Sequence, residues 1–292
     1  MRWGLSLDRT CSRCRRTSKL IYDYRKDDSR FPLGFRCCNR KCSIYNKYVS
    51  IRKGTFLGNS HLWVQEILIL CCIFVRGKYD YESIKYECHL RDDSTFLSSR
   101  TISDWLTFIR EVCIHAVLKI SDGKIGGPGL TVEVDEAKFG RRKFNVGRVI
   151  DGKWVVGGIC RETKDVFLVP CHDNKRNGLA LVEITTQNVN PGSLIITDCW
   201  KGYEGLTQEG WDHLTVNHSY NFVDPFTEAH TQNIENLWWQ VKRSLPDTYT
   251  RKDGSLLYHF GEFLWRKKII TEPSQAFLVL LKHAAGLYPP PK

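Results

Sequence analysis

The sequence lacks the long apolar segments and targeting signals of membrane and secreted proteins. Its longest apolar run, Ile67–Val75, is far shorter than the roughly 20 residues that a membrane-spanning helix needs. No basic segment followed by an apolar stretch, the pattern of a secretory signal peptide, lies at the start of the sequence. Internal repeats and low-complexity segments are also absent, and 42% of the 292 residues are hydrophobic, enough for a substantial core. We therefore expect a soluble globular protein that is not secreted and has no membrane partner.

Acidic residues are scarce in the first 60 positions. This segment holds 15 lysines and arginines but only 4 acidic residues, and the whole chain has a formal net charge of +11. The positive charge therefore belongs to the N-terminal part. A dense positive charge attracts polyanions, most often nucleic acid, in a salt-dependent way. A basic surface that serves only solubility is the alternative, unless another feature supports DNA binding.

Twelve cysteines are many for a chain without a secretion signal, and they indicate free thiols or metal ligands rather than disulfides. Cys11 and Cys14 form one short pair, and Cys37, Cys38 and Cys42 follow after a gap. Zn²⁺ prefers four thiolates in a tetrahedron, which two such pairs on facing turns can provide. The spacing predicts a structural zinc ribbon with Cys11, Cys14, Cys37 and Cys42 as ligands. Pairing of Cys42 with Cys38 instead of Cys37 stays open, and unrelated buried thiols are the alternative to a zinc site.

Sequence pattern divides the N-terminal residues 1–120 into two parts. Residues 1–58 form the predicted ribbon, and residues 59–120 show three helical patterns, at 61–75, 81–88 and 98–113. Three helices suit a helix-turn-helix, an interpretation that depends on the basic ribbon beside them. Residues 121–129 contain four glycines and a proline, which indicates a linker.

A change of pattern marks a second domain over residues 130–275. Short β-branched runs at 130–134, 153–160 and 165–169 predict antiparallel strands, and a helical segment follows at 177–186. The apolar run 193–197 is typical of a buried parallel strand. Further helices follow, and residues 276–292 are expected to form a C-terminal tail. We predict an α/β fold with a domain of ribonuclease H type.

Three acidic residues are candidates for one site. Asp135 and Asp198 end two of the predicted strands, and carboxylates at the ends of neighbouring strands converge. Glu235 lies in a helical segment, where Asn233 points about 200° away from it, so only one of these two can face a common site. Mg²⁺ prefers oxygen ligands, and two such ions held by a few carboxylates are typical of phosphoryl transfer.

An ordered series of motifs runs through the chain: Cys11-x2-Cys14, Arg36-Cys37-x4-Cys42, Ser50-Ile51-Arg52-Lys53-Gly54-Thr55-Phe56, Ser60-His61-Leu62, Val134-Asp135-Glu136, Pro191-Gly192-Ser193, Thr197-Asp198-Cys199-Trp200-Lys201-Gly202-Tyr203, Val216-Asn217-His218-Ser219 and His230-Thr231-Gln232-Asn233-Ile234-Glu235-Asn236-Leu237-Trp238. With these motifs, over nearly its whole length, the chain resembles the DDE transposases of Merlin-type DNA transposons and their bacterial insertion-sequence relatives with an ISXO2-like transposase domain.

The resemblance implies an enzyme that cuts DNA at terminal inverted repeats and transfers the cut strand to target DNA. It implies a catalytic triad of Asp135, Asp198 and Glu235 that holds two Mg²⁺ or Mn²⁺ ions, and Lys242 as a basic residue that contacts DNA. Some bacterial relatives have asparagine at the third position, which would point to Asn233. The implied partners are double-stranded DNA and further copies of the chain. The implied location is the nucleus, or the cytoplasm for a bacterial source.

Several other side chains are candidates for DNA contact or metal binding. Glu133 shares a strand face with Asp135, so it is either an auxiliary ligand or, as we favour, a surface carboxylate. His218 is either close to the scissile phosphate or structural, and Lys138 and Lys143 belong to a basic turn that is either solvated or bound to DNA. The residues that we expect to contact DNA, besides Lys242, are Arg52, Lys53, Arg141, Arg142 and His230.

Two other functions stay open. One is a domesticated, sequence-specific DNA-binding protein that keeps the fold but does not transpose. The other is a ribonuclease H-like nuclease or resolvase that cleaves DNA without strand transfer.

Overall fold

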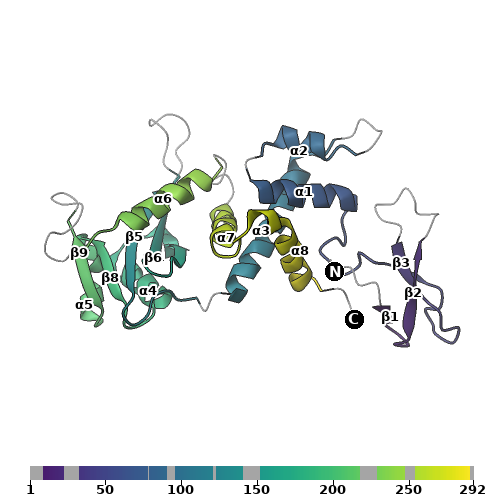
Figure 1. Ribbon diagram of the computed structural model, residues 1–292, viewed down its shortest axis with the longest axis horizontal. Helices are drawn as coiled ribbons and strands as arrows, with labels where there is room; N and C mark the ends of the chain where they lie inside the picture. Colours follow the sequence, from purple (N-terminus) through teal and green to yellow (C-terminus); the bar gives the residue numbers. More distant parts are fainter. Residues whose placement is uncertain are drawn as a thin grey trace. The chain divides into compact units, whose positions relative to one another are not determined.

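The chain folds into two compact units in the computed structural model (Figure 1). Unit 1 comprises residues 1–116 and 270–292, and unit 2 comprises residues 117–269. The structure describes residues 9–22, 33–77, 79–90, 96–120, 123–140, 152–217, 229–246 and 254–289. Among these residues, no helix is both long enough and apolar enough to cross a membrane.

Unit 1 begins with a four-stranded antiparallel sheet in the order β1-β2-β3-β4. Its strands are β1 (Arg9–Thr10), β2 (Thr17–Tyr22), β3 (Leu33–Cys37) and β4 (Tyr48–Ser50). The sheet buries little apolar surface besides Phe35, and beside it Cys11, Cys37 and Cys42 form a buried cluster of their own. The cysteines therefore take the place of a hydrophobic core, as the predicted zinc ribbon requires.

The rest of unit 1 is helical, with α1 (Val64–Arg76), α2 (Tyr81–Glu87), α3 (Ser99–Ile120, whose last turn crosses into unit 2) and α8 (Ala276–Leu287). Helix α1 begins where Glu66 accepts a hydrogen bond from the backbone N–H of Trp63 at 2.6 Å, and α2 begins at Asp80, which caps Ser83 N at 2.8 Å. Three helices thus lie where the sequence predicts them.

Helix α8 lies in the segment that we expected to form a C-terminal tail. Ala276, Leu280 and Ala284 recur every four residues and are buried, and the helix packs against α1. A 3₁₀ turn, η5 (Pro273–Gln275), leads into it. The apolar period of this segment therefore joins the end of the chain to unit 1.

Unit 2 is a mixed α/β unit built on a five-stranded sheet in the order β7-β6-β5-β8-β9. Strands β5 (Thr131–Phe139), β6 (Lys153–Cys160) and β7 (Val166–Pro170) form an antiparallel meander, whereas β8 (Leu194–Asp198) and β9 (Asp212–Val216) run parallel to β5. The three antiparallel strands and the parallel strand after the helix are as the sequence predicts, and β9 is an addition.

Helices cover both faces of this sheet (Figure 1). One face, with Val132 and Val134, packs against α4 (Gly178–Asn188) and α5 (Glu204–Gln208). The other face, with Ala137 and Phe139, packs against α6 (Gln232–Ser244) and α7 (Ser255–Lys268). Two 3₁₀ turns, η3 (His172–Asn174) and η4 (Lys201–Tyr203), flank α4 and β8. The side chains of β5 therefore alternate between two hydrophobic cores.

The expected linker, residues 121–129, is part of unit 2, and the structure describes it from residue 123 on. Ile125 is buried in the core beneath α4 and forms a β-bridge with Val189. Gly126 has a positive φ of 76°, and a Cβ there would overlap the side chain of Ser193, whose hydroxyl accepts a hydrogen bond from Gly127 N at 2.8 Å. The glycines thus allow a close approach of two backbones rather than a free connection.

Gly157 on β6 faces the indole ring of Trp238 on α6. A Cβ at Gly157 would overlap this ring, so we expect Gly157→Ala to push α6 away from the sheet and to lower the free energy of unfolding by about 1–3 kcal/mol. Urea denaturation followed by tryptophan fluorescence measures the effect. Gly286→Ala in α8 is the matched control, because a Cβ there meets no atom within 4 Å. An unchanged stability of Gly157→Ala would contradict the tight packing of α6.

Candidate functional site

Three carboxylates of unit 2 lie close together. Asp135, Glu136 and Asp198 each offer one oxygen atom, and these atoms lie within 4.8 Å of one another. We call these residues the acidic group. The carboxylates of Asp135 and Asp198 thus converge as their places on neighbouring strands predict. Glu136 is an addition that the sequence marked only as a neighbour of Asp135.

The register of the sheet explains this convergence. The parallel pairing of β5 with β8 ends at Glu133 and Ile196, while β8 stays paired with β9 as far as Asp198. The two strands therefore part just before Asp135 and Asp198, and no hydrogen-bond ladder closes the sheet between them. Asp135 and Glu136 are neighbours on β5 and point to opposite faces of the strand. Because β8 is not paired with β5 at this point, both carboxylates can nevertheless approach Asp198.

Backbone and side-chain donors orient the acidic group. The indole N–H of Trp238 donates to Asp135 Oδ2 at 2.9 Å, and the backbone N–H of Trp200 donates to Asp198 Oδ1 at 3.1 Å. The hydroxyl of Tyr203 donates to Glu136 Oε2 at 2.5 Å, and Arg176 forms an ion pair with Glu136. Asp135 and Glu136 are thus held by donors from other elements, and Asp198 by the turn that follows its own strand.

Burial makes this site unfavourable for several negative charges at once. Burial and the charge of Glu136 raise the pKa of Asp135 to about 7. Burial also raises the pKa of Glu136 and, together with the Glu136 charge, that of the Tyr203 hydroxyl. A cation at the acidic group would stabilise the ionised carboxylates. The residues therefore fit a hard divalent ion such as Mg²⁺, which prefers oxygen ligands.

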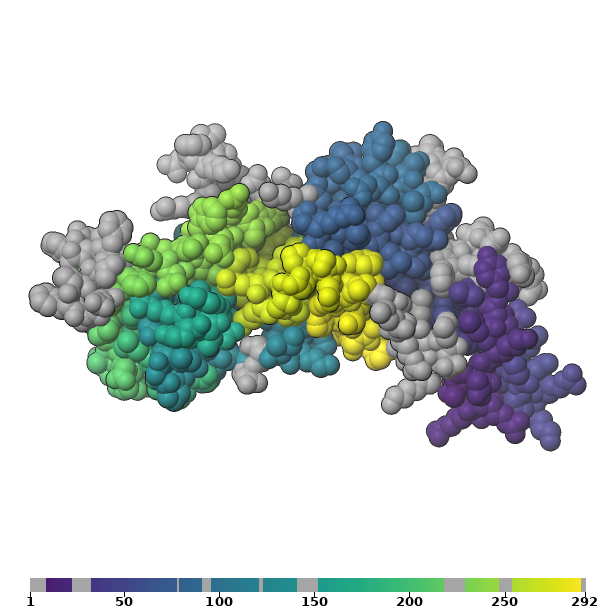
Figure 2. All heavy atoms as spheres, in the orientation of Figure 1, coloured from purple at the N-terminus to yellow at the C-terminus, as the bar shows by residue number. Residues whose placement is uncertain are grey.

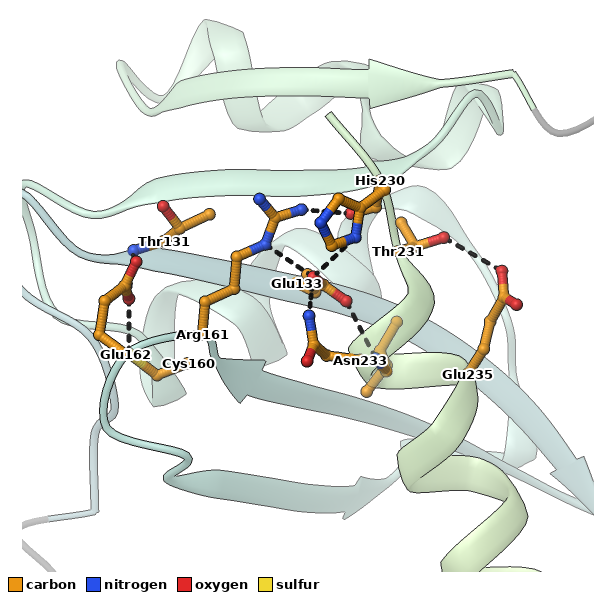
Figure 3. A network of polar contacts seen from close by, with 10 residues as sticks. Thr131, Glu133, Cys160, Arg161, Glu162, His230, Thr231, Asn233 and Glu235 are labelled. Atoms are coloured by element: carbon orange, nitrogen blue, oxygen red, sulfur yellow. Dashed lines mark hydrogen bonds and ion pairs between the residues drawn. The ribbon is translucent and has the colours of Figure 1, made fainter. Parts of the chain in front are cut away.

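The third residue of the predicted triad lies apart from the acidic group. Glu235 is on the exposed side of α6, where its carboxylate accepts a hydrogen bond from the hydroxyl of Thr231 at 3.2 Å. Asn233 points the other way and donates to Glu133 Oε1 at 2.7 Å (Figure 3). Of the two alternatives, Asn233 is held in a buried network and Glu235 has the accessible carboxylate. A metal-binding role of Glu235 stays a prediction.

Glu133 is the centre of that network. We expected a surface carboxylate, but the side chain is fully buried, because the start of α6 covers this position of β5. Its partners are Arg161 Nε at 2.7 Å, Asn233, and the backbone N–H of Ile234 at 3.0 Å (Figure 3). His230 Nδ1 lies 3.5 Å away, and Arg161 also donates to the His230 carbonyl at 2.6 Å. Glu133 thus fixes the N-terminus of α6.

The residues expected to contact DNA have different surroundings. Arg52 is buried, and its guanidinium donates to the carbonyls of Leu57 at 2.7 Å and Ser60 at 3.2 Å. These contacts hold the turn around it and indicate a structural role. Lys53 and Lys242 are exposed. The side chain of His230 is 26% exposed and faces Glu133. Arg141, Arg142, Lys143 and His218 lie outside the described residues.

Helix α6, which carries Lys242, lies at the surface of unit 2 (Figure 2). Lys242 Nζ is 5.8 Å from the ring centroid of Phe139, so its stem covers the core while the helix face stays accessible. At the next position, the guanidinium of Arg243 lies 4.9 Å from the ring centroid of the exposed Trp239, one turn earlier in the helix. This face of α6 thus presents positive charge next to Glu235.

The N-terminal cysteines form a second candidate metal site. Cys11, Cys14, Cys37 and Cys42 have sulfur atoms within 4.8 Å of one another. The sulfurs of Cys11 and Cys42 are 3.8 Å apart and those of Cys14 and Cys37 are 3.6 Å apart. Zn–S bonds of about 2.3 Å in a tetrahedron place sulfurs about 3.8 Å apart, so the cluster is compatible with zinc. A hydrogen bond from the backbone of Arg16 lowers the pKa of Cys14 to about 6, whereas burial and the neighbouring thiols raise the pKa of Cys37, so a bound cation is needed to hold all four sulfurs as thiolates.

Cys37 and Cys38 differ clearly in this structure. Cys37 is buried in the cluster, whereas Cys38 is exposed and its sulfur faces the Arg36 carbonyl. We expect Cys37→Ser to lose the zinc of the purified protein and Cys38→Ser to keep about one zinc per chain, since a structural site needs all four ligands. Zinc content measured by elemental analysis tests this. Zinc retained by Cys37→Ser would contradict the ligand assignment.

The network around Glu133 predicts a large loss of stability when its carboxylate is removed. Glu133→Ala leaves Arg161 and the start of α6 without their buried acceptor, so we expect the free energy of unfolding to fall by about 3–5 kcal/mol. Urea denaturation measures the change. Glu183→Ala on the exposed side of α4 is the control and should change stability by less than about 0.5 kcal/mol. An equal effect of both substitutions would refute the anchoring role.

Comparison with known proteins finds relatives for part of the chain. Residues 125–268, nearly all of unit 2, match the family of the ISXO2-like transposase domain. An uncharacterized transposase-like protein of Haemophilus influenzae is 31% identical over 65 residues, which cover 22% of this chain. The match covers 51% of that relative, so the chain spans about half of its length. Together these similarities support a transposase family for the chain, with the acidic group inside the matched domain.

Proposed function

We propose that the chain is a DDE transposase of Merlin type, which cuts DNA at the terminal inverted repeats of its element and joins the cut end to target DNA. The observation that carries the proposal is the convergence of the carboxylates of Asp135 and Asp198 where β5 and β8 part. This convergence lies inside the domain that matches a transposase family.

The proposal includes a ribonuclease H-like fold for unit 2. Support comes from the antiparallel meander β5-β6-β7, followed by two strands parallel to β5 on its other side, with helices on both faces. In this arrangement the first and fourth strands are neighbours. Asp135 in the middle of β5 and Asp198 at the end of β8 therefore form one site, to which helix α6 would add a further carboxylate.

The reaction consists of two in-line displacements at phosphorus. Water cleaves a phosphodiester at the transposon end, and the released 3′-hydroxyl then attacks a phosphodiester of target DNA, whose bond to the 3′-oxygen of the target strand breaks as the new bond forms. Two Mg²⁺ or Mn²⁺ ions, when bound, would supply the positive charge that activates the attacking oxygen and stabilises the leaving one. Asp135 and Asp198 would hold the metal, and Glu235 would complete the triad from α6.

Other residues of the chain orient these groups and the substrate. Trp238 fixes the carboxylate of Asp135 by its indole N–H, and the backbone N–H of Trp200 fixes that of Asp198. Lys242 is placed on the same exposed face of α6 as Glu235, seven residues further along, where it can neutralise a DNA phosphate. These contacts hold the ligands and the substrate in position before the chemical step.

DNA binding is proposed for the ribbon of unit 1. Zinc would hold its Cys11, Cys14, Cys37 and Cys42 turns in place, and the surrounding basic side chains would contact the phosphate backbone. Both transposon ends must be handled together, so we propose an oligomer on DNA, and a nuclear location follows from the Merlin assignment. The exposed basic residues of the ribbon region are Arg13, Arg15, Arg16, Lys19, Arg40, Lys41, Lys47 and Lys53.

A domesticated DNA-binding protein is the second candidate. The observation that favours it is that the Glu235 carboxylate lies outside the acidic group. Such a protein would bind the terminal repeat through unit 1 and would neither cut nor join DNA.

Cleavage and strand transfer on a labelled duplex with the element's terminal repeat, in Mg²⁺ or Mn²⁺, separate the two candidates. We expect Asp198→Ala to lower both rates by at least about 100-fold, because loss of even an indirect metal contact costs 10–100-fold. Asp212→Ala on the exposed start of β9 is the matched control. Specific binding without cleavage by the wild-type protein would support the second candidate. Cleavage without joining would instead indicate a nuclease or resolvase.

A further inference from the structure

We propose that Glu136 is a metal ligand beside Asp135 and Asp198, and that Arg176 and Tyr203 are positioning residues that hold its carboxylate for this purpose. The inference rests on the proposed function, because it takes the acidic group to be the metal centre. It adds a ligand that the triad does not contain.

The first argument is the place of Glu136 on the sheet. As the neighbour of Asp135 on β5, it points to the face covered by α4, whereas Asp135 points to the face covered by α6. Since β5 is not paired with β8 beyond Glu133, side chains from both faces of β5 can reach the end of β8 there. An oxygen of Glu136 therefore lies within 4.8 Å of an oxygen of Asp135 and one of Asp198.

The second argument is the use of the carboxylate's acceptor sites. Tyr203 donates to Oε2 at 2.5 Å, and Arg176 pairs with Oε1. An ionised carboxylate offers about four lone-pair sites, so these contacts leave each oxygen of Glu136 with acceptor capacity. The Glu136 side chain is only 3% exposed, so water has little access to it. An oxygen of Glu136 with such capacity lies within 4.8 Å of an oxygen of each of the other two carboxylates.

The third argument is the rigidity of the two residues that hold Glu136. The guanidinium of Arg176 lies between two indole rings, 4.9 Å from the centroid of Trp154 and 4.1 Å from that of Trp200. Tyr203 is fully buried, and its ring packs edge-on against Trp200. Neither partner can follow a rotating carboxylate. Glu136 is thus pre-organised rather than one member of a mobile surface cluster.

The fourth argument is charge. Three ionised carboxylates and the Arg176 guanidinium carry a net charge of −2, which one divalent cation neutralises. Arg176 thus offsets one of the three negative charges, so a single divalent cation bound by all three carboxylates balances the charge that remains. Without a cation, the three carboxylates would leave buried negative charge unbalanced, which is costly. The arrangement therefore suits a bound divalent ion.

Binding of Mn²⁺ to the full-length protein tests the proposal without DNA or catalysis. The free-ion electron paramagnetic resonance signal gives the Kd. We expect Glu136→Gln to weaken binding at least tenfold and Asp198→Asn to abolish it. Glu183→Gln on the exposed side of α4 removes the same charge and should bind as the wild type does. Urea denaturation of each variant shows whether it is folded.

Tyr203→Phe provides a second test that keeps Glu136 and the buried ring. It removes only the hydroxyl that orients Oε2, so we expect the Kd for Mn²⁺ to rise several-fold while the urea midpoint changes little. If Glu136→Gln does not fold, the Kd of Tyr203→Phe for Mn²⁺ tests the role of Glu136 in its place.

The possible outcomes distinguish this inference from the proposed function. Wild-type affinity of Glu136→Gln and Tyr203→Phe, with binding lost in Asp198→Asn, would refute the role of Glu136 and leave the proposed function intact. Equal Mn²⁺ binding by the wild type and Asp198→Asn, or none by either, would refute both, since the acidic group would then not be the metal centre.

Discussion

The buried carboxylate of Glu133 and its donors set the position of helix α6, on which the rest of the candidate site depends. A buried charge is tolerated only when it is paired and hydrogen-bonded, and Arg161, Asn233 and the backbone of Ile234 meet this need together. Satisfying Glu133 therefore fixes the first turn of α6 against β5. One turn further along, Trp238 is then level with Asp135 and donates to it. The same helix carries Glu235 and Lys242 on its exposed side.

The parting of β5 and β8 is the second constraint. A sheet paired along its full length would keep the side chains of its two faces apart. Because this pairing ends at Glu133 and Ile196, Asp135 and Glu136 both reach Asp198 although they point to opposite faces. Both faces of the sheet are covered by hydrophobic packing, so the opening lies in a firm frame. Burial in this frame also raises the pKa of Asp135, and therefore favours a bound cation.

The sequence predicts those features that depend on local pattern. Apolar runs that lead into Asp135 and Asp198 predict the convergence of two carboxylates, although β5 does not end at Asp135 but continues to Phe139, and the cysteine spacing predicts the four-sulfur cluster. Local sequence pattern does not predict the features that depend on residues far apart in the chain. Arg176 and Tyr203, which hold Glu136, are 40 and 67 residues away from it, and no periodicity links them. Burial of Glu133 and Arg52 likewise depends on covering segments. The segment of α8, where we expect a tail, forms a helix because its apolar side packs against α1, which lies 200 residues earlier in the chain.

The two candidate metal sites differ in what the surrounding fold can do without a metal. In the ribbon, Cys11, Cys37 and Cys42 are themselves most of the buried cluster, so removal of a metal would leave almost no core there. The acidic group instead lies between two hydrophobic cores that contain no metal ligand. Folding of unit 2 therefore does not need the cation, and its hard oxygen ligands suit ions that exchange readily. Thiolates that replace a hydrophobic core suit a structural zinc ion that stays bound. Carboxylates between two hydrophobic cores suit a cation that exchanges with solvent.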